Sequence, residues 1–409
     1  MAKSLSGMGL IVFPYLYYYA RDLATRSTSR NAVKMGLRIM SLCAEPRSIN
    51  IAMMLGRHEE FGDYAATMII NVGASRNIRV NEKLFRLVER LHGWGRIITL
   101  KKIAGFIEKR HKDWIFFKGY QNNISVMETA LYASAYGNLD ARLEPAKISR
   151  KTYDAATDLI KGLLERDIEY YKPVLTTFGN YIRHSCSMDN TVMNYYVLHE
   201  MLDFLKNKHK ADSKENIAKL TKILSNKKVK TEIIKTAAMS NAHIGRWYAD
   251  KLARIYKVNL FNVYWNLLQS NKADENIWYY VMESANQKDT NKILDLADQV
   301  IIYGYIATGP TNKIFAHGPE YFQHNILGYI IQGLGALPNA ARNDISWKLI
   351  MTALNNPIIN IRNGAINAIE KWGKDKIPSG IKIELKKQIK KETDSEIIDR
   401  LKNLQKQDS

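Results

Sequence analysis

The sequence predicts an all-α protein built from stacked helical pairs, and three observations support this prediction. Helical patterns separated by short breaks run along the whole chain. We find no alternating strand pattern followed by a tight hairpin turn. The length of 409 residues exceeds what one hydrophobic core usually accommodates. Together they favour an elongated array of helices over one globular core.

The clearest helix is PIINIRNGAINAIEKW, residues Pro357 to Trp372. One helical stripe carries the apolar residues Ile358, Ile361, Ala365, Ile369 and Trp372. The opposite stripe carries Asn360, Asn363, Asn367 and Lys371. We expect Pro357 in the first turn, where no backbone N–H is needed. This pattern is typical of the second helix of a HEAT-type repeat, and it predicts a HEAT/armadillo-like α-solenoid.

Related second-helix patterns recur along the chain, in which a β-branched residue near a basic one opens a run of Ala, Leu and Ile. They begin at Ala32-Val33-Lys34, Arg96-Ile97, His243-Ile244 with Arg246, and Ile361-Arg362. At about 40 residues per unit the chain has room for about ten pairs, although the spacing is irregular. We expect one continuous solenoid, with an N-terminal array at 1–206 and a C-terminal array at 207–409.

The two ends of the chain have distinct patterns. The run Gly9 to Ala20, GLIVFPYLYYYA, contains a proline and four tyrosines, unlike a signal peptide, and it is too short to cross a bilayer. We expect it to be the first buried helix, with contact at a membrane surface as the alternative. The lysine- and glutamate-rich tail from Lys382 suits a terminal capping repeat with a frayed end.

Three stretches are candidate breaks between helices: Gly73–Asn77, Asn207–Ser213 and Tyr303–Pro319. The last is the longest. A loop of this length in an array is either functional or a plain excursion between repeats.

Composition is that of an ordinary folded soluble protein, with 46% hydrophobic and 24% charged residues. Cys43 and Cys186 lie far apart and outside any CxxC pattern, which argues against a disulfide framework or a structural zinc site. We therefore expect a reducing, cytoplasmic compartment and no transmembrane segment.

The formal charge of +20 is unevenly distributed. Residues 1–110 hold 18 Lys and Arg against 8 Asp and Glu, which is half of the net excess in about a quarter of the chain. Arg26, Arg30, Lys34 and Arg38 recur at four-residue spacing, so they form one basic ridge if the helix is continuous there. Such a ridge can follow phosphate groups, which makes nucleic acid a possible partner.

The segment His92-Gly93-Trp94-Gly95-Arg96 is a second candidate binding surface. Its glycines suit a tight turn, and we interpret the segment as the turn between two helices of one repeat. We expect Trp94 to fill a gap in the core and Arg96 to bind a carboxylate or pack on Trp94.

Other polar clusters have structural explanations. His199 and Asp203 lie one turn apart, but the zincin pattern needs a second histidine at 203, so we expect a buried His–Asp hydrogen bond. His58-Glu59-Glu60 precedes an apolar run, where acidic residues favour a helix start.

The remaining histidines form no complete constellation. His317 and His324 flank GPEYFQ without a third ligand, and Cys186 near His184 has no orienting partner. We therefore predict no metal site and assign no catalytic residue.

Three segments resemble an uncharacterised bacterial family of HEAT-like repeat proteins, some members of which are labelled limonene hydroxylase. They are LHGWGRIITLKKI (Leu91–Ile103), the tetrad from His58 to Phe61, and the run from Asp113 to Leu139. The resemblance covers most of the chain and implies a helical solenoid. A hydroxylase needs haem, flavin or a non-haem metal. We find no Gly-rich dinucleotide fingerprint and no facial-triad pattern, so we expect no cofactor.

These observations lead to three functional hypotheses. The first is a non-enzymatic scaffold that binds a protein partner on the concave face of the solenoid. The second is a solenoid that binds nucleic acid through the basic N-terminal quarter. The third is an enzyme with a site on the concave face. The oligomeric state stays open.

Overall fold

The computed structural model describes residues 13–122, 124, 126–239, 243–315 and 317–405. Helices hold 77% of the residues, and the described part of the chain contains no β-strand, so the all-α prediction is confirmed. The chain forms two compact units, Met1–Asn226 and Lys227–Ser409. The boundary between the two units lies at 226/227. The sequence predicts this boundary at 206/207, at the start of the break Asn207–Ser213.

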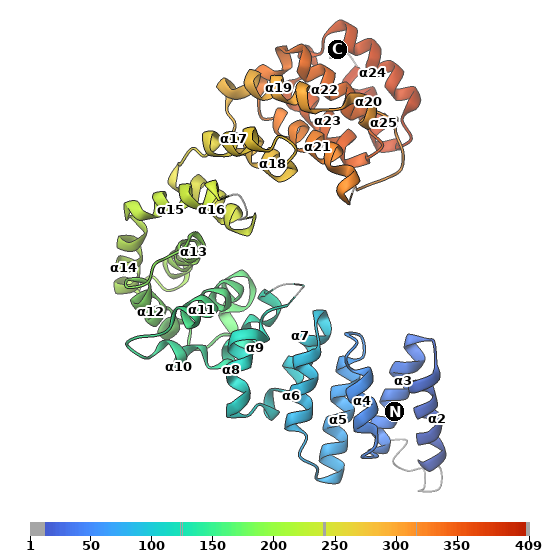
Figure 1. The fold of residues 1–409 in the computed structure, drawn as a ribbon, viewed down its shortest axis with the longest axis vertical. Coiled ribbons are helices and arrows are strands. Elements are labelled where there is room, and N and C mark those ends of the chain that lie inside the picture. The colour runs from blue at the N-terminus through green and yellow to red at the C-terminus, as the bar shows by residue number, and fades with distance from the viewer. Residues whose placement is uncertain (1–12, 123, 125, 240–242, 316, 406–409) are drawn as a thin grey trace. The chain divides into compact units, whose positions relative to one another are not determined.

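The first unit is a series of helical pairs (Figure 1). Its α-helices are α2 (Phe13–Arg26), α3 (Arg30–Cys43), α4 (Ser48–Leu55), α5 (Gly62–Arg76), α6 (Asn81–Arg90), α7 (Gly93–Lys102), α8 (Lys112–Trp114), α9 (Met127–Gly137), α10 (Leu139–Leu143), α11 (Arg150–Gly162), α12 (Val174–Ser185), α13 (Val192–Lys208) and α14 (Lys214–Leu224). The chain continues α8 as a π-helical turn, η3 (Ile115–Gly119), before α9.

Packing in the first unit follows a repeating order. The second helix of each pair contacts the second helix of the next, so that α3 packs on α5, α5 on α7, α7 on α9, α9 on α11 and α11 on α13. On the other side, α10 contacts α12 and α12 contacts α14. Buried side chains such as Leu37, Ile69 and Leu100 fill the space between these layers. Each pair therefore buries its apolar stripe against its neighbours.

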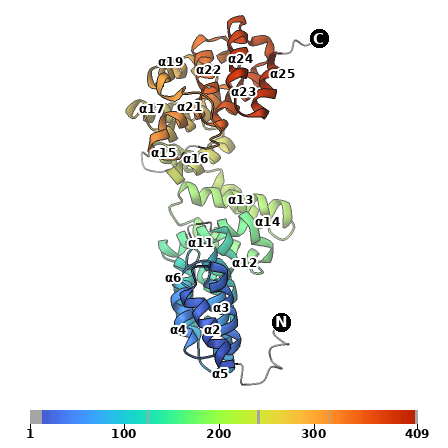
Figure 2. The same ribbon diagram turned by 90° about the vertical axis from the view of Figure 1, so that its right-hand side faces the viewer.

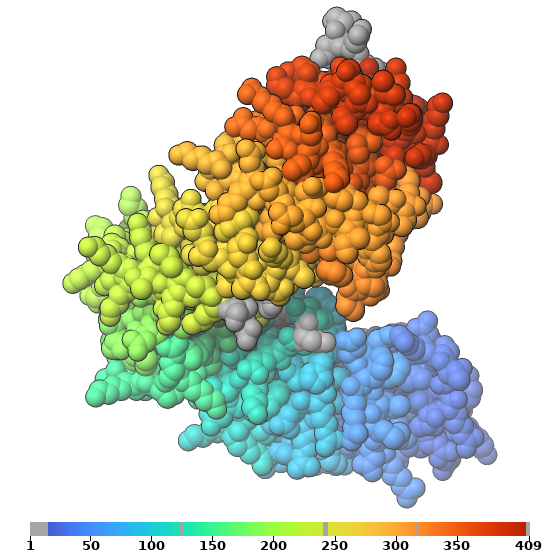
Figure 3. Space-filling model, turned by 45° about the horizontal axis from the view of Figure 1, so that its top comes forward, coloured from blue at the N-terminus to red at the C-terminus, as the bar shows by residue number. Residues whose placement is uncertain are grey.

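The second unit repeats this order (Figure 2). Its α-helices are α15 (Lys227–Ala238), α16 (His243–Tyr256), α17 (Phe261–Ser270), α18 (Glu275–Ser284), α19 (Thr290–Val300), α20 (Tyr303–Ile306), α21 (Phe322–Leu334), α22 (Asp344–Leu354), α23 (Ile359–Trp372), α24 (Ser379–Lys391) and α25 (Ser395–Gln405). Helix α18 packs on α21, α21 on α23 and α23 on α25. Side chains close most of the spaces between neighbouring ribbons of this unit (Figure 3).

A buried arginine is the fourth residue of three second helices: Arg96 in α7, Arg246 in α16 and Arg362 in α23. Each guanidinium donates hydrogen bonds to backbone carbonyls in the last turn of the preceding helix or just after it, at Glu89 and Leu91, at Met239, and at Asn356 and Pro357. Carbonyls at and beyond the end of a helix have no N–H of the next helical turn as partner, so they need another donor. This role explains the basic residue in three of the four recurring sequence patterns, whereas Lys34 in the first pattern pairs with Glu60.

Two sequence expectations are corrected by the structure, one about the start of α23 and one about the burial of α2. Helix α23 begins at Ile359 with Ile358 as its N-cap, so Pro357 precedes the helix and its carbonyl accepts from Arg362 instead. Of the predicted N-terminal buried helix, residues 9–12 lie outside the described residues. Ala20 in α2 is buried, but Tyr15, Tyr18 and Tyr19 are exposed, Tyr15 by 79%. Within the described residues, no helix has both the length and the apolar composition needed to cross a membrane.

Candidate binding site

A groove of about 510 Å³ lies on the second unit between α21 and α23. Gly328 approaches Ile361, and seven residues further on Gly335 approaches Ala368, so the two helices run in the same direction. The lining residues are Asn325, Gly328, Tyr329, Gln332, Gly335, Asn360, Ile361, Asn363, Gly364, Asn367, Ala368 and Lys371. Five of them carry a primary amide, so the groove is rich in groups that both donate and accept hydrogen bonds.

Helical spacing explains how the amides reach one wall of the groove. On α21, Asn325, Tyr329 and Gln332 follow one another at four and three residues and share a face. The other face of α21 is buried and carries Ile326, Leu327, Ile330, Ile331 and Leu334. Burial of this apolar face fixes the rotation of α21 and turns the polar face outward.

The other wall is the polar stripe of α23 that the sequence predicts. Asn360, Asn367 and Lys371 are exposed and Asn363 is half-buried, whereas the apolar stripe of α23 is buried. The prediction of the two faces is confirmed. The sequence pattern predicts no binding role for these asparagines, because a polar helix face is usually only solvated.

Two glycines keep the floor of the groove open. A Cβ atom added at Gly328 would lie 3.5 Å from Ile361 Cγ1, and one added at Gly364 would lie 3.4 Å from Ile331 Cγ2. Both distances are ordinary contacts, so small side chains are compatible with the packing here. Their absence leaves the volume between the amides free.

Arg400 of α25 fixes the orientation of two amides. Its guanidinium donates to Asn363 Oδ1 at 3.0 Å and to Asn367 Oδ1 at 2.6 Å, and it also pairs with Glu370. A guanidinium only donates, so the amide oxygens must face Arg400. The amide nitrogens of Asn363 and Asn367 are then the groups left for a ligand.

Glu275 of α18 fixes the orientation of an amide on the α21 wall. Here the nitrogen of the amide is bonded, and not its oxygen. Asn325 donates from Nδ2 to Glu275 Oε2 at 2.8 Å, so its oxygen is the group left for a ligand. Beside it, burial and the nearby Glu275 carboxylate raise the pKa of Tyr329. Tyr329 therefore keeps its hydroxyl proton at neutral pH. The groove has donors on the α23 wall and an oriented acceptor on the α21 wall.

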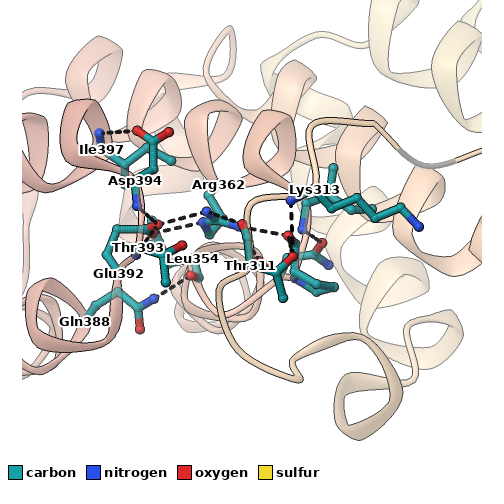
Figure 4. Close-up of polar contacts among 12 residues, drawn as sticks. Thr311, Lys313, Leu354, Arg362, Gln388, Glu392, Thr393, Asp394 and Ile397 are labelled. Atoms are coloured by element: carbon teal, nitrogen blue, oxygen red, sulfur yellow. Dashed lines mark hydrogen bonds and ion pairs between the residues drawn. The ribbon is translucent and has the colours of Figure 1, made fainter.

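A buried ion pair fixes the first turn of α23. The Arg362 guanidinium lies 2.8 Å from Glu392, and both side chains are 0% exposed. Glu392 also accepts from the backbone N–H groups of Thr393 and Asp394, while Arg362 donates to the carbonyl of Thr311 (Figure 4). Arg362 therefore links three segments: the long loop after α20, the start of α23 and the turn between α24 and α25.

The predicted basic ridge is divided and largely paired. Helix α2 ends at Arg26 and α3 begins at Arg30, so the helix is not continuous and the four residues do not form one face. Arg26 contacts Asp22, and both Arg30 and Lys34 form ion pairs with Glu60. The guanidinium of Arg38 lies over the ring of Tyr64, 5.5 Å from its centre.

These contacts also correct the role predicted for Glu60. It lies in the turn before α5, which begins at Gly62, and its carboxylate binds the two cations of α3 instead of capping a helix. The hydrogen bonds and charges of Lys34 and Arg30 lower the pKa of Glu60. Glu60 therefore stays charged and neutralises part of the predicted ridge.

Leu91 and His92 lie between α6 and α7, with exposed His92 as the N-cap of α7. Gly93 to Arg96 form the first turn of α7, so the prediction that the whole segment is a turn between two helices is wrong. Gly93 has φ +58°, and a Cβ at Gly95 would lie 2.6 Å from Glu59 Cα, so both positions need glycine. Trp94 is 51% exposed, so the prediction that it fills the core is wrong. Arg96 is buried and binds backbone carbonyls, and its guanidinium lies over Trp114, not Trp94.

The other polar clusters stay separate. His199 Nδ1 lies 3.4 Å from Asp203 Oδ2, but Asp203 is 56% exposed, so the predicted buried hydrogen bond is a surface contact. His324 is buried beside Asn356, whereas the ring of exposed His317 stacks beside Phe315.

Buried His184 contacts the backbone carbonyl of Leu143. The thiol of exposed Cys186 donates a hydrogen bond to the backbone carbonyl of Ile182. Within the described residues, no group of three or more His, Cys, Asp and Glu side chains is arranged to hold a metal ion.

No protein-family model matches the chain, and no curated protein matches it. The candidate site therefore rests on the geometry of the groove itself.

Proposed function

We propose that the protein is a non-enzymatic scaffold that binds a protein partner on the exposed face of its second helices. The single observation that carries this proposal is the groove between α21 and α23, with oriented amides on both walls and an open glycine floor. Amides are neither nucleophiles nor proton carriers near neutral pH, so this lining suits binding and not acid–base chemistry.

The proposed architecture is a HEAT-like solenoid. Its support is the repeated contact of second helix on second helix in both units, together with the buried arginine at the fourth position of α7, α16 and α23. In a solenoid the exposed faces of successive second helices line one continuous binding surface. The resemblance of Leu91–Ile103 to the HEAT-like bacterial family agrees with this proposal, and we expect the protein to act in the cytoplasm.

Nucleic acid is the weaker alternative. Binding to phosphates gains free energy by releasing counterions when unpaired Lys and Arg contact the backbone. Arg30 and Lys34 already have Glu60 as counter-charge, and Arg26 has Asp22. The ridge therefore offers fewer free cations than the sequence suggested.

Salt and nuclease separate the two hypotheses. The full chain is immobilised and exposed to lysate of its native cell, with and without nuclease, and washed at rising salt. A protein partner should be retained after nuclease and between about 50 and 200 mM salt, a range in which binding through several phosphates weakens about a thousandfold or more. Capture that needs intact nucleic acid or is lost over this range would contradict the proposal.

A further inference from the structure

We infer that the groove between α21 and α23 binds an extended segment of the partner through its peptide backbone, a conclusion that rests on the proposed function. A peptide bond presents one N–H donor and one C=O acceptor, and a primary amide presents the complementary pair. In an extended segment these backbone groups are unpaired and point to both sides of the chain. The groove offers amides on both of its walls.

The orientation of the amides gives the groove a defined polarity. Asn363 and Asn367 present nitrogens, because Arg400 occupies their oxygens, and these nitrogens suit peptide carbonyls. Asn325 presents its oxygen, because Glu275 occupies its nitrogen, and this oxygen suits a peptide N–H. Arg400 and Glu275 hold these orientations, so little ordering of the wall is needed on binding.

The length of the groove suits a short segment. Asn360 and Lys371 are eleven residues apart on α23, about 16 Å at the rise of an α-helix. An extended chain covers that length in about five residues. Phe322, exposed on the same face of α21 one turn before Asn325, provides an apolar contact beside one end.

Two other kinds of occupant fit less well. An amphipathic helix needs an apolar groove, and it leaves no backbone groups for the amides. A nucleic acid needs several cations along its phosphates, whereas Lys371 is the one cationic residue among the lining residues. The chemistry of the groove therefore favours an extended peptide.

Selected peptides test this inference. Phage-displayed random decapeptides are selected on the full chain, and a selected decapeptide is synthesised with a fluorescent label for anisotropy titration. Asn363→Asp combined with Asn367→Asp keeps the oxygens that Arg400 binds and removes both free donors. We expect this variant to weaken the decapeptide about tenfold, since each hydrogen bond contributes about 0.5–1.5 kcal/mol.

Further variants separate backbone binding from other effects. Gly364→Phe fills the groove and leaves the five amides in the sequence, so it should abolish binding. Its Cβ meets only an ordinary contact, so the packing of α23 should be kept. Gln299→Glu makes the same amide-to-carboxylate change at an exposed residue of α19, outside the groove, and should leave affinity unchanged. A decapeptide N-methylated at alternate residues should bind at least about tenfold more weakly if backbone N–H groups are used.

Three results would overturn the inference: selection yields no decapeptide, the groove variants bind it as the native chain does, or N-methylation has no effect. If one of these results is found but a partner protein is still retained at high salt, the proposed scaffold function stands. The groove is then not a peptide-binding site. Loss of both the partner and the decapeptides would contradict both.

Discussion

The pair Arg362 and Glu392 shows how much one buried contact can hold in place. Both side chains are fully buried, and the guanidinium also donates to the carbonyls of Asn356, Pro357 and Thr311. Removing one ion of a buried pair leaves the other without a counter-charge in a region of low dielectric constant. The remaining partner then destabilises the fold.

Glu392→Gln should therefore lower the free energy of unfolding by about 3–5 kcal/mol. The matched control is Lys387→Met, which removes an exposed ion pair with Glu384 in the same helix α24 and should cost less than about 1 kcal/mol. Urea unfolding followed by circular dichroism measures both changes. Equal small losses in the two variants would contradict the role given to Arg362.

His324 makes the stability of the second unit depend on pH. Its Nδ1 lies 3.0 Å from Asn356 Nδ2 and 3.3 Å from Asn356 Oδ1, and the ring is buried. Burial lowers the pKa of His324 below its ordinary 6.5. As the pH falls below about 6.5, the unfolded chain takes up a proton that the folded chain does not, so stability falls.

We expect the melting temperature to fall more between pH 7 and pH 5 in the native chain than in His324→Gln, with these pH values chosen about the ordinary pKa of histidine. Calorimetry of both proteins over this range provides the measurement. A variant whose pH dependence equals that of the native chain would show that His324 does not cause the effect.

At the scale of the element, the second helices α7, α16 and α23 share a fourth-position arginine that satisfies carbonyls of the preceding turn. Arg96→Met should cost about 2–4 kcal/mol, because the carbonyls of Glu89, Leu91 and Gln121 each lose a donor. Arg26→Met, on an exposed side chain at the end of α2, should change stability by less than about 0.5 kcal/mol. Thermal unfolding distinguishes them, and equal shifts would contradict a capping role for Arg96.

The helices themselves follow from sequence, but the candidate site does not. The apolar stripe from Ile361 to Trp372 predicts α23 because helical period and burial are properties of one segment. The orientation of Asn363 depends on Arg400, which lies 37 residues further along the chain. The orientation of Asn325 depends on Glu275, 50 residues before it. No local sequence pattern shows these pairings. The asparagine stripe of α23 therefore indicates only a solvated face at the level of the sequence.

The prediction of one basic ridge is wrong for a similar reason, since it also depends on contacts that a local pattern does not show. Four-residue spacing from Arg26 to Arg38 counts as one face only if the helix is unbroken, and the chain leaves the helix between α2 and α3. Glu60, 30 residues after Arg30, then pairs with two of the cations. Counting charges along a sequence overestimates a basic patch when the neutralising acid comes from a distant part of the chain.

At the scale of the whole molecule, a net charge of +20 does not identify the partner. What matters is where oriented, unpaired groups are exposed, and in the second unit these are the amides between α21 and α23. A repeat protein can hold such groups rigidly, since each helix is fixed by its neighbours on both sides. We therefore propose that the partner is recognised at this groove.

Site-specific photocrosslinking tests whether the partner is recognised at this groove. A photoreactive amino acid replaces Lys371, which lines the groove and is not one of its amides, or, as control, exposed Lys386 on α24, and the full chain is irradiated in native lysate. We expect a protein crosslink from position 371 that survives nuclease and is absent from position 386. Crosslinking to nucleic acid, or equal crosslinking from both positions, would contradict it.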